Sequence, residues 1–322
     1  MSGPIRTIVA GISQPVENDP TLLAAAALAR RTGARLHLVM AFTPPPVFSP
    51  PQLAYTYTDW LLLHTENLQT RLEAAARRLP GGESATGHAV AGAPAPAILD
   101  TAERVHADMV VVGAARPGRL GGSFLGTTAQ RVLRGADVPV LVVRRPLRTS
   151  LRRVLLTTDL SEQSAAVHEQ GLDTVAALFG EPLAARSLLV VSCLILPSPL
   201  SRGALDAAAR AEAEGFLRTR RPRSPAVEPV IRSGAPGEEI PAEAAAWDAD
   251  LLVVGTHARG WGERLLLGSV AEASLRDAPC NVLAIPPRAL ALEQPSSKAA
   301  PAEEPAGVMK DVHEDAGEPV GA

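Results

Sequence analysis

Four glycine and hydroxyl positions in the second half of the chain have a spacing that suits phosphate binding. Gly255 ends the apolar run 251–254, Gly260 follows in a loop, and Gly268-Ser269 opens a helix-like segment. A strand, a glycine-rich loop and a helix start gather backbone N–H groups around a phosphate, and the helix dipole adds to the attraction. Ser269 is placed to cap the helix and to donate its hydroxyl to a phosphate oxygen. The same pattern occurs without a ligand, so phosphate binding and a structural role both stay open.

The sequence lacks the residues that a Walker-type phosphate loop, a disulfide framework or a metal site would need. No G-x-x-x-x-G-K-[ST] segment is present, which excludes a Walker-type phosphate loop. Cys193 and Cys280 form no CxxC pair, and the histidines show no metal-ligand spacing. We therefore expect no disulfide framework and no metal site. His257 lies in the glycine-rich loop, where we interpret it as a polar rim residue rather than a base.

The glycine-rich segment has a counterpart earlier in the chain. Gly92-Ala93-Pro94 recurs as Gly234-Ala235-Pro236, which is 234 − 92 = 142 residues later. A repeat this regular indicates two copies of one fold. At the same offset, the first half places four residues at the phosphate-loop positions: Gly113, Gly118, Gly126 and Thr127.

The opening strands of the two copies align at a different offset. Ile5–Ala10 matches Val154–Thr157 at an offset near 147, so the first half carries about five extra residues before Gly92. We place them in the proline-rich segment Pro44–Pro51, which cannot continue a strand or a helix.

The elements that position these residues alternate between short apolar strands and helices. Such strands predict a parallel sheet with helices on both faces, hence an α/β fold with two tandem open, twisted, Rossmann-like domains. The first half shows the order, and the second half repeats it: strands at Ile5–Ala10, Leu36–Phe42, His88–Val90, Met109–Val112 and Val140–Val143, and helices at Thr21–Thr32, Asp59–Leu79, Pro94–Val105 and Thr127–Leu133.

Length and composition agree with two domains. The 322 residues are 46% hydrophobic, 20% charged and 3% aromatic, with a net charge of −3, which disfavours nucleic acid and anionic membranes as partners. The arginines between Arg144 and Arg153 are interpreted as a solvated linker. No signal peptide or membrane span is recognisable, so we expect a soluble, cytoplasmic protein. The predicted division is 1–146, 147–288 and a disordered acidic tail, 289–322.

The second half resembles the universal stress protein family. Its nucleotide-binding pattern is G-x2-G-x9-G-[ST], and the stretch from Gly255 to Ser269 follows it except at Ala258, where the second glycine is expected. The segment Val154–Ser161 resembles the family's first strand, whose final Asp contacts the adenine-ribose end of ATP, and Asp159 holds that position. The resemblance covers nearly all of 5–287 as two copies.

This resemblance implies an adenine nucleotide alpha hydrolase-like fold that binds ATP, or ADP or AMP, mainly in the second half. The implied second-half binding residues are Thr158, Asp159, Gly255, Ala258, Gly260, Gly268, Ser269 and Val270. The first half keeps Gly113, Gly118, Gly126 and Thr127, but Arg116 replaces a glycine and Ile12 matches the Asp position. It is therefore a structural partner or a weak site.

The function implied is a stress-response regulatory module rather than an enzyme. Phosphoryl transfer needs metal carboxylates, a cationic clamp and a group that orients the nucleophile, and Asp159 alone does not supply them. Two alternatives stay open: a nucleotide-independent interaction module and a weak ATPase or phosphotransferase. We expect the last strands, Val138–Val143 and Cys280–Ile285, to pair within the chain about a pseudo-twofold axis. A further homodimer and an unidentified regulatory protein partner are left open.

Overall fold

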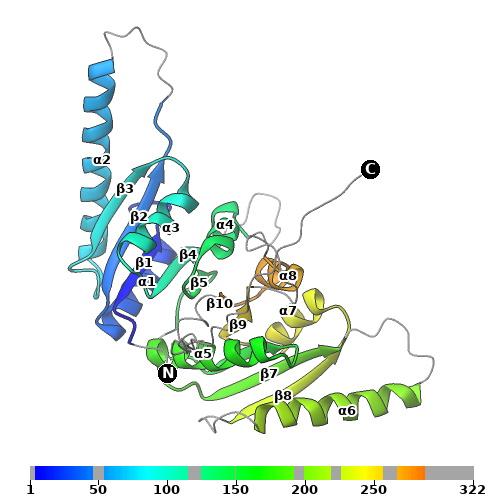
Figure 1. Ribbon diagram of the computed structural model, residues 1–322. Helices are drawn as coiled ribbons and strands as arrows, with labels where there is room; N and C mark the ends of the chain where they lie inside the picture. The colour runs from blue at the N-terminus through cyan, green and yellow to red at the C-terminus, as the bar shows by residue number, and fades with distance from the viewer. Residues whose placement is uncertain are drawn as a thin grey trace, which may run out of the picture.

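The computed structural model describes residues 4–45, 54–114, 125–148, 150–191, 199–218, 226–256 and 267–286. Within each half, strands and helices alternate along these residues, as the sequence predicts (Figure 1). The strands are β1 (Thr7–Gly11), β2 (Arg35–Phe42), β3 (Thr86–Ala91), β4 (Met109–Gly113), β5 (Val140–Val143), β6 (Arg153–Thr158), β7 (Ala184–Val191), β8 (Val227–Ser233), β9 (Leu251–Gly255) and β10 (Asn281–Ile285).

The helices begin and end at recognisable signals. Asp19 caps the first helix by accepting the N–H groups of Thr21 and Leu22, and Gly33 ends it in the left-handed region at φ 69°. The second helix begins five residues earlier than Asp59, the predicted start. The helices are α1 (Pro20–Thr32), α2 (Ala54–Arg77), α3 (Pro94–Arg104), α4 (Thr127–Gly135), α5 (Glu162–Phe179), α6 (Pro199–Arg218), α7 (Pro236–Ala246) and α8 (Ser269–Asp277).

The strands of both halves form one continuous sheet. Their order is β3-β2-β1-β4-β5-β10-β9-β6-β7-β8, and every neighbouring pair is parallel except β5 and β10. The predicted α/β class is therefore confirmed. In each half the strand order reverses next to the first strand, between β1 and β4 and between β6 and β9. Ligands bind at such reversals in parallel sheets.

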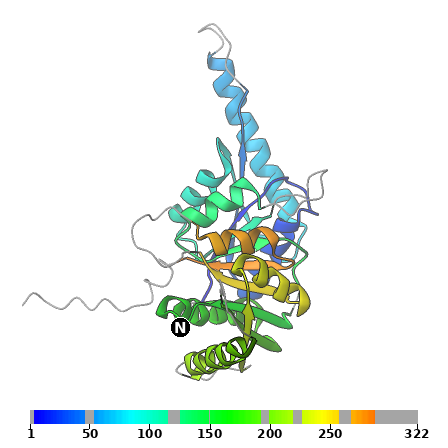
Figure 2. The same cartoon turned by 90° about the vertical axis from the view of Figure 1, so that its right-hand side faces the viewer.

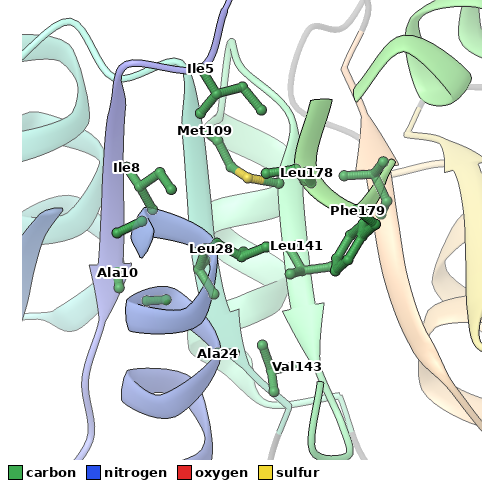
Figure 3. Packing of buried hydrophobic residues seen from close by; sticks show 14 of the residues in the cluster. Ile5, Ile8, Ala10, Ala24, Leu28, Met109, Leu141, Val143, Leu178 and Phe179 are labelled. Atoms are coloured by element: carbon green, nitrogen blue, oxygen red, sulfur yellow. The ribbon is translucent and has the colours of Figure 1, made fainter. Parts of the chain in front are cut away.

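Helices cover both faces of the sheet. Buried residues of α1, α2 and α5 pack on one face, and α6 packs against β7 and β8 on the same side. Residues of α3, α4, α7 and α8 form the core on the other face. Figure 3 shows the first of these cores, where Leu28 of α1 lies over Ile8, Met109 and Leu141 of three adjacent strands.

The two halves meet through their last strands, as expected from the sequence. β5 and β10 are antiparallel, with Leu141 opposite Leu283 and Val142 opposite Val282. Helices also meet across the pseudo-twofold axis: Figure 2 shows α4 beside α8, where Arg134 and Glu272 form an ion pair of 3.8 Å. The pairing covers two sheet edges that would otherwise be open.

Several arginines of the predicted linker instead bind the second half, so a fully solvated linker is wrong. Arg144 donates through its guanidinium to the carbonyl of Leu275 at 2.8 Å, at the end of α8. Arg148 forms an ion pair of 3.0 Å with Asp250, whose side chain is 2% exposed. Carbonyls at a helix end and a buried carboxylate both attract cations, which explains the docking. The pattern of charge alone does not reveal these partners.

No helix in the described ranges is long and apolar enough to cross a membrane. The free cysteine Cys280 is buried at the start of β10, and burial raises the pKa of its thiol to about 11. Such a thiol is a poor nucleophile near neutral pH.

Two histidines form a pair between β2 and β3. His37 Nδ1 and His88 Nε2 lie 3.0 Å apart, and the rings stack with centroids 5.3 Å apart. Burial, then the neighbouring His37 and Arg104, lower the pKa of His88 to about 4 against the opposing effect of Glu73. Burial, then Arg35 and Arg104, lower the pKa of His37. Both rings are therefore neutral in the folded protein near pH 7.

This pair predicts a loss of stability in mild acid. Because the folded pKa of His88 lies below its unfolded value, its neutral form stabilises the fold above about pH 6.5, and this contribution is lost as the pH falls toward about 4. We expect the melting temperature of His88→Gln to fall less between pH 6.5 and 4 than that of the wild type. Equal falls in the melting temperature of the variant and the wild type over this pH range would contradict the prediction.

Candidate functional site

A cavity of about 370 Å³ lies at the carboxyl ends of the second-half strands, beside the strand-order reversal. Strands β6 and β9 end there side by side, because Leu156 pairs with Val253. We call this space the second-half cavity. Its wall comprises Thr157, Thr158, Asp159, Ser161, Gln163, Ser164, Val167, Leu188, Val190, Pro236, Ile240, Val254, Gly255, Gly268, Val270, Ala271 and Ser274.

A turn after β6 holds Asp159 at the rim of this cavity. Leu160 has φ 61°, which reverses the chain, and Thr158 Oγ1 accepts the Leu160 N–H at 2.9 Å. Ser161 donates its backbone N–H to Asp159 Oδ1 at 3.0 Å and its hydroxyl to the same oxygen. These bonds fix the exposed carboxylate in one orientation, as a polar anchor requires.

The amino end of α8 forms another part of the wall. Gly268 is the N-cap and supplies no side-chain hydrogen bond, so the first backbone N–H groups of α8 lack a side-chain cap. The prediction that Ser269 caps this helix is therefore wrong: Ser269 is the first helical residue, is exposed and does not line the cavity. Val270, 40% exposed, does line it. Open N–H groups at a helix start favour an anion.

Residues of β7 and α7 make part of the wall apolar, whereas β6, the start of α5 and α8 also contribute polar side chains. Leu188 and Val190 of β7 form the wall together with Pro236 and Ile240 of α7. Ser274 of α8 also lines the cavity, yet its hydroxyl is buried and has no hydrogen-bond partner in the described structure. A buried hydroxyl without a partner costs about 1–3 kcal/mol. The cavity thus combines an apolar slot, an unpaired hydroxyl, a carboxylate and an open helix end.

Two glycines of the predicted site have a packing role as well. A Cβ on Gly113 would lie 2.7 Å from Thr21 Oγ1, and a Cβ on Gly255 would lie 3.1 Å from Val167 Cγ2. These glycines let α1 and α5 approach the ends of β4 and β9. Their presence alone is therefore not evidence for a ligand.

The first half has an equivalent cavity of about 600 Å³, which we call the first-half cavity. It lies at the ends of β1 and β4, and it includes the predicted site residues Gly113, Gly126 and Thr127. Because β5 and β10 are antiparallel, the two cavities open at opposite edges of the sheet. The wall of the first-half cavity comprises Gly11, Ile12, Ser13, Gln14, Asp19, Pro20, Thr21, Val39, Ala41, Pro94, Ile98, Val112, Gly113, Ala114, Gly126, Thr127, Thr128, Ala129, Val143 and Arg144.

The strand register corrects the first-half counterpart of Asp159. Ile8 pairs with Met109 and Val154 pairs with Leu251, so the first strands are equivalent at 154 − 8 = 146 residues rather than near 147. The residue equivalent to Asp159 is therefore Ser13, whereas Ile12 corresponds to Thr158 and is 5% exposed.

A pair of carboxylates supports this alignment. Asp108 accepts the backbone N–H groups of Arg6 and Thr7, and Asp250 accepts those of Arg152 and Arg153. Both pairs again differ by 146 residues, because 152 − 6 = 153 − 7 = 146.

Serine and aspartate exchange roles between the halves. In the first half Ser13 donates to Asp19 at 3.1 Å, and Asp19 caps α1. In the second half Ser161 caps α5 and donates to Asp159. Asp19 is 2% exposed and its carboxylate already accepts three hydrogen bonds, whereas Asp159 is exposed. The first half therefore does have a carboxylate in its cavity wall, which the sequence did not reveal, but it serves the helix.

Three predicted site residues, Ala258, Gly260 and Gly118, lie outside the described residues, as do Arg116, His257 and the predicted tail. Thr158, Asp159, Gly255, Gly268 and Val270 do line the second-half cavity. In the part of the chain that the structure covers, no group of three or more His, Cys, Asp or Glu side chains is arranged to hold a metal.

Comparison with known proteins identifies the family. The model of the universal stress protein family matches residues 4–144 and 150–286, so the chain belongs to this family as two tandem copies. A Thermus aquaticus universal stress protein is 34% identical over 120 residues, which cover 37% of this chain and 85% of the relative. A Mycobacterium bovis universal stress protein is 28% identical over 220 residues, covering 65% of this chain and 75% of the relative.

Solved structures agree on the fold. A universal stress protein from Archaeoglobus fulgidus matches with a TM-score of 0.52 at 20% identity, covering 86% of this chain and 96% of that chain. A Pseudomonas aeruginosa protein assigned to the same family matches with a TM-score of 0.63 at 20% identity, covering 89% and 95%.

Proposed function

We propose that the second half binds one adenine nucleotide, ATP or its products ADP or AMP, and that the chain is a regulatory module in the cytoplasm rather than an enzyme. The observation that carries this proposal is the composition of the second-half cavity. An oriented carboxylate, an apolar slot and an uncapped helix end surround one space of about 370 Å³. This volume is within the usual range for small-molecule sites.

The residues of the cavity fit the parts of a nucleotide. Asp159 is an acceptor for ribose hydroxyls, and the N–H groups that start α8 are donors for a phosphate. The apolar walls from β7 and α7 suit the faces of a purine ring, and the unpaired Ser274 hydroxyl offers it a hydrogen bond. Bound nucleotide would set the conformation that a regulatory partner recognises.

The same wall supports binding rather than phosphoryl transfer. Among the described wall residues Asp159 is the one carboxylate, and they include no Lys or Arg. Phosphoryl transfer relies on metal-binding carboxylates and on cations that stabilise the developing charge. In this proposal residues 147–288 form the nucleotide-binding domain, and residues 1–146 form a domain with a different or weaker site.

Mass spectrometry of small molecules released from gently purified protein tests the proposal. We expect an adenine nucleotide at close to one equivalent per chain, or saturable ATP binding by calorimetry where it was lost during purification. Absence of bound nucleotide together with absence of ATP binding at millimolar concentration would contradict it.

A further inference from the structure

The two cavities share part of their wall. Besides the N-cap glycines Gly126 and Gly268, five positions that differ by 142 in number carry the same residue in both halves, on α3 and α7, on β4 and β9, and on α4 and α8. These pairs are Pro94/Pro236, Ile98/Ile240, Val112/Val254, Gly113/Gly255 and Ala129/Ala271. Differences in ligand size must therefore come from the remaining walls.

The wall from the second strand of each half differs. Gly11 pairs with Val39 in the first half, and its equivalent Thr157 pairs with Leu188 in the second, so Val39 and Leu188 are equivalent. Two residues further along the same strands, Ala41 is equivalent to Val190. Each first-half side chain is the smaller: Val39 lacks one methylene of Leu188, and Ala41 lacks two methyl groups of Val190.

These two positions open space, whereas a third does not. Gly11 is smaller than Thr157, but Ile98 fills the difference, because a Cβ on Gly11 would lie 2.4 Å from Ile98 Cδ1. Ala41, in contrast, is only partly buried and lines the cavity, so the space that its smaller side chain leaves belongs to the cavity. The first-half cavity is also the larger of the two, about 600 Å³ against about 370 Å³.

This wall faces the apolar part of a ligand. In the second half the carboxylate of Asp159 and the start of α8 are among the polar parts of the wall, whereas Leu188 and Val190 belong to the apolar slot. A ligand with a flat apolar ring and a charged group places the ring in the slot, since burial of apolar surface is favourable and desolvation of charge is costly.

We propose that the halves select their ligands by ring size: the first half accepts a purine nucleotide whose base carries a bulky apolar substituent, and the second half excludes it. Val39 and Ala41 admit the substituent, while Leu188 and Val190 block it. This inference rests on the proposed nucleotide binding and extends it to the first half. A packed wall rejects even small excess volume, because overpacking forces side chains out of their rotamers.

Calorimetric titrations of ATP and N6-benzyl-ATP into reciprocal variants of the full chain test this. We expect wild-type protein to bind N6-benzyl-ATP through its first half, and Val39→Leu/Ala41→Val to weaken this binding at least about tenfold. Leu188→Val/Val190→Ala should add a second N6-benzyl-ATP site, which raises the measured stoichiometry from about one to about two per chain. Melting curves of each variant verify that the fold is retained.

The outcomes separate the two proposals. If ATP binds but N6-benzyl-ATP binds neither half, or if the reciprocal variants leave its stoichiometry and affinity unchanged, the size selection is wrong while the nucleotide site stands. If ATP itself binds to neither half of the wild-type chain, the proposed function fails, and the size selection fails with it.

Discussion

Asp159→Ala is expected to weaken ATP binding by the second half about ten- to hundredfold, which is the cost of losing a charge-assisted hydrogen bond. Ser161 holds this carboxylate at the cavity rim before any ligand arrives, so the wild-type chain need not order it on binding. Asp159→Asn keeps the shape and one acceptor but removes the charge, and we expect an intermediate affinity. Calorimetry with ATP measures all three proteins.

The control for this change is Ser13→Ala, at the equivalent position of the first half. It should alter ATP binding by the second half less than about twofold, because the two cavities open at opposite edges of the sheet. Equal losses in Asp159→Ala and Ser13→Ala would contradict the assignment of the anchor to the second half.

Asp250→Ala is expected to destabilise the fold by about 2–3 kcal/mol, since it removes a buried carboxylate and leaves two partly buried N–H donors without their acceptor. Asp250 is 3% exposed and accepts the N–H groups of Arg152 and Arg153 at 2.7 and 3.1 Å, where the linker enters β6. Its ion pair with Arg148 adds less, because that arginine is half exposed. A fall in the melting temperature of roughly 5–10 °C corresponds to this loss.

Asp108→Ala is the matched control in the first half. Asp108 accepts the N–H groups of Arg6 and Thr7 in the same geometry, but it is exposed, so water replaces the lost acceptor. We expect a loss of at most about 1 kcal/mol. Similar melting temperatures for Asp250→Ala and Asp108→Ala would contradict this prediction, because they would show that burial of the Asp250 carboxylate does not increase the cost of losing these hydrogen bonds.

Periodicity and repeats predicted the fold because they are properties of the chain itself. Short apolar runs such as Leu251–Val254, spaced by helix-like segments, fit only a covered parallel sheet. The constant offset between Pro94 and Pro236 predicted two copies, and the covalent link between them predicted the pairing of β5 with β10. These features need no knowledge of side-chain packing.

Features that depend on three-dimensional packing were missed. The sequence alignment matched Asp159 with Ile12, whereas the structure matches it with Ser13, one residue later. The alignment was wrong by one residue because the first strands of the two halves share no identical residues that would fix their register. The capping roles of Asp19 and Ser161 follow from where each helix starts, and the docking of Arg148 depends on Asp250, about a hundred residues away.

The most direct test of the account is a titration of ATP into Gly268→Val and into Gly126→Val, which change the N-cap glycines of α8 and α4. Gly268 has φ −59° and Gly126 has φ −62°, values that any residue can adopt. The backbone therefore tolerates valine at both positions, and the valine side chain acts mainly by blocking the approach of a ligand to the helix start. The account predicts that Gly268→Val abolishes the ATP binding of the second half and that Gly126→Val leaves it largely intact. Loss of ATP binding in Gly126→Val with full binding in Gly268→Val would place the adenine-nucleotide site in the first half and contradict the central claim.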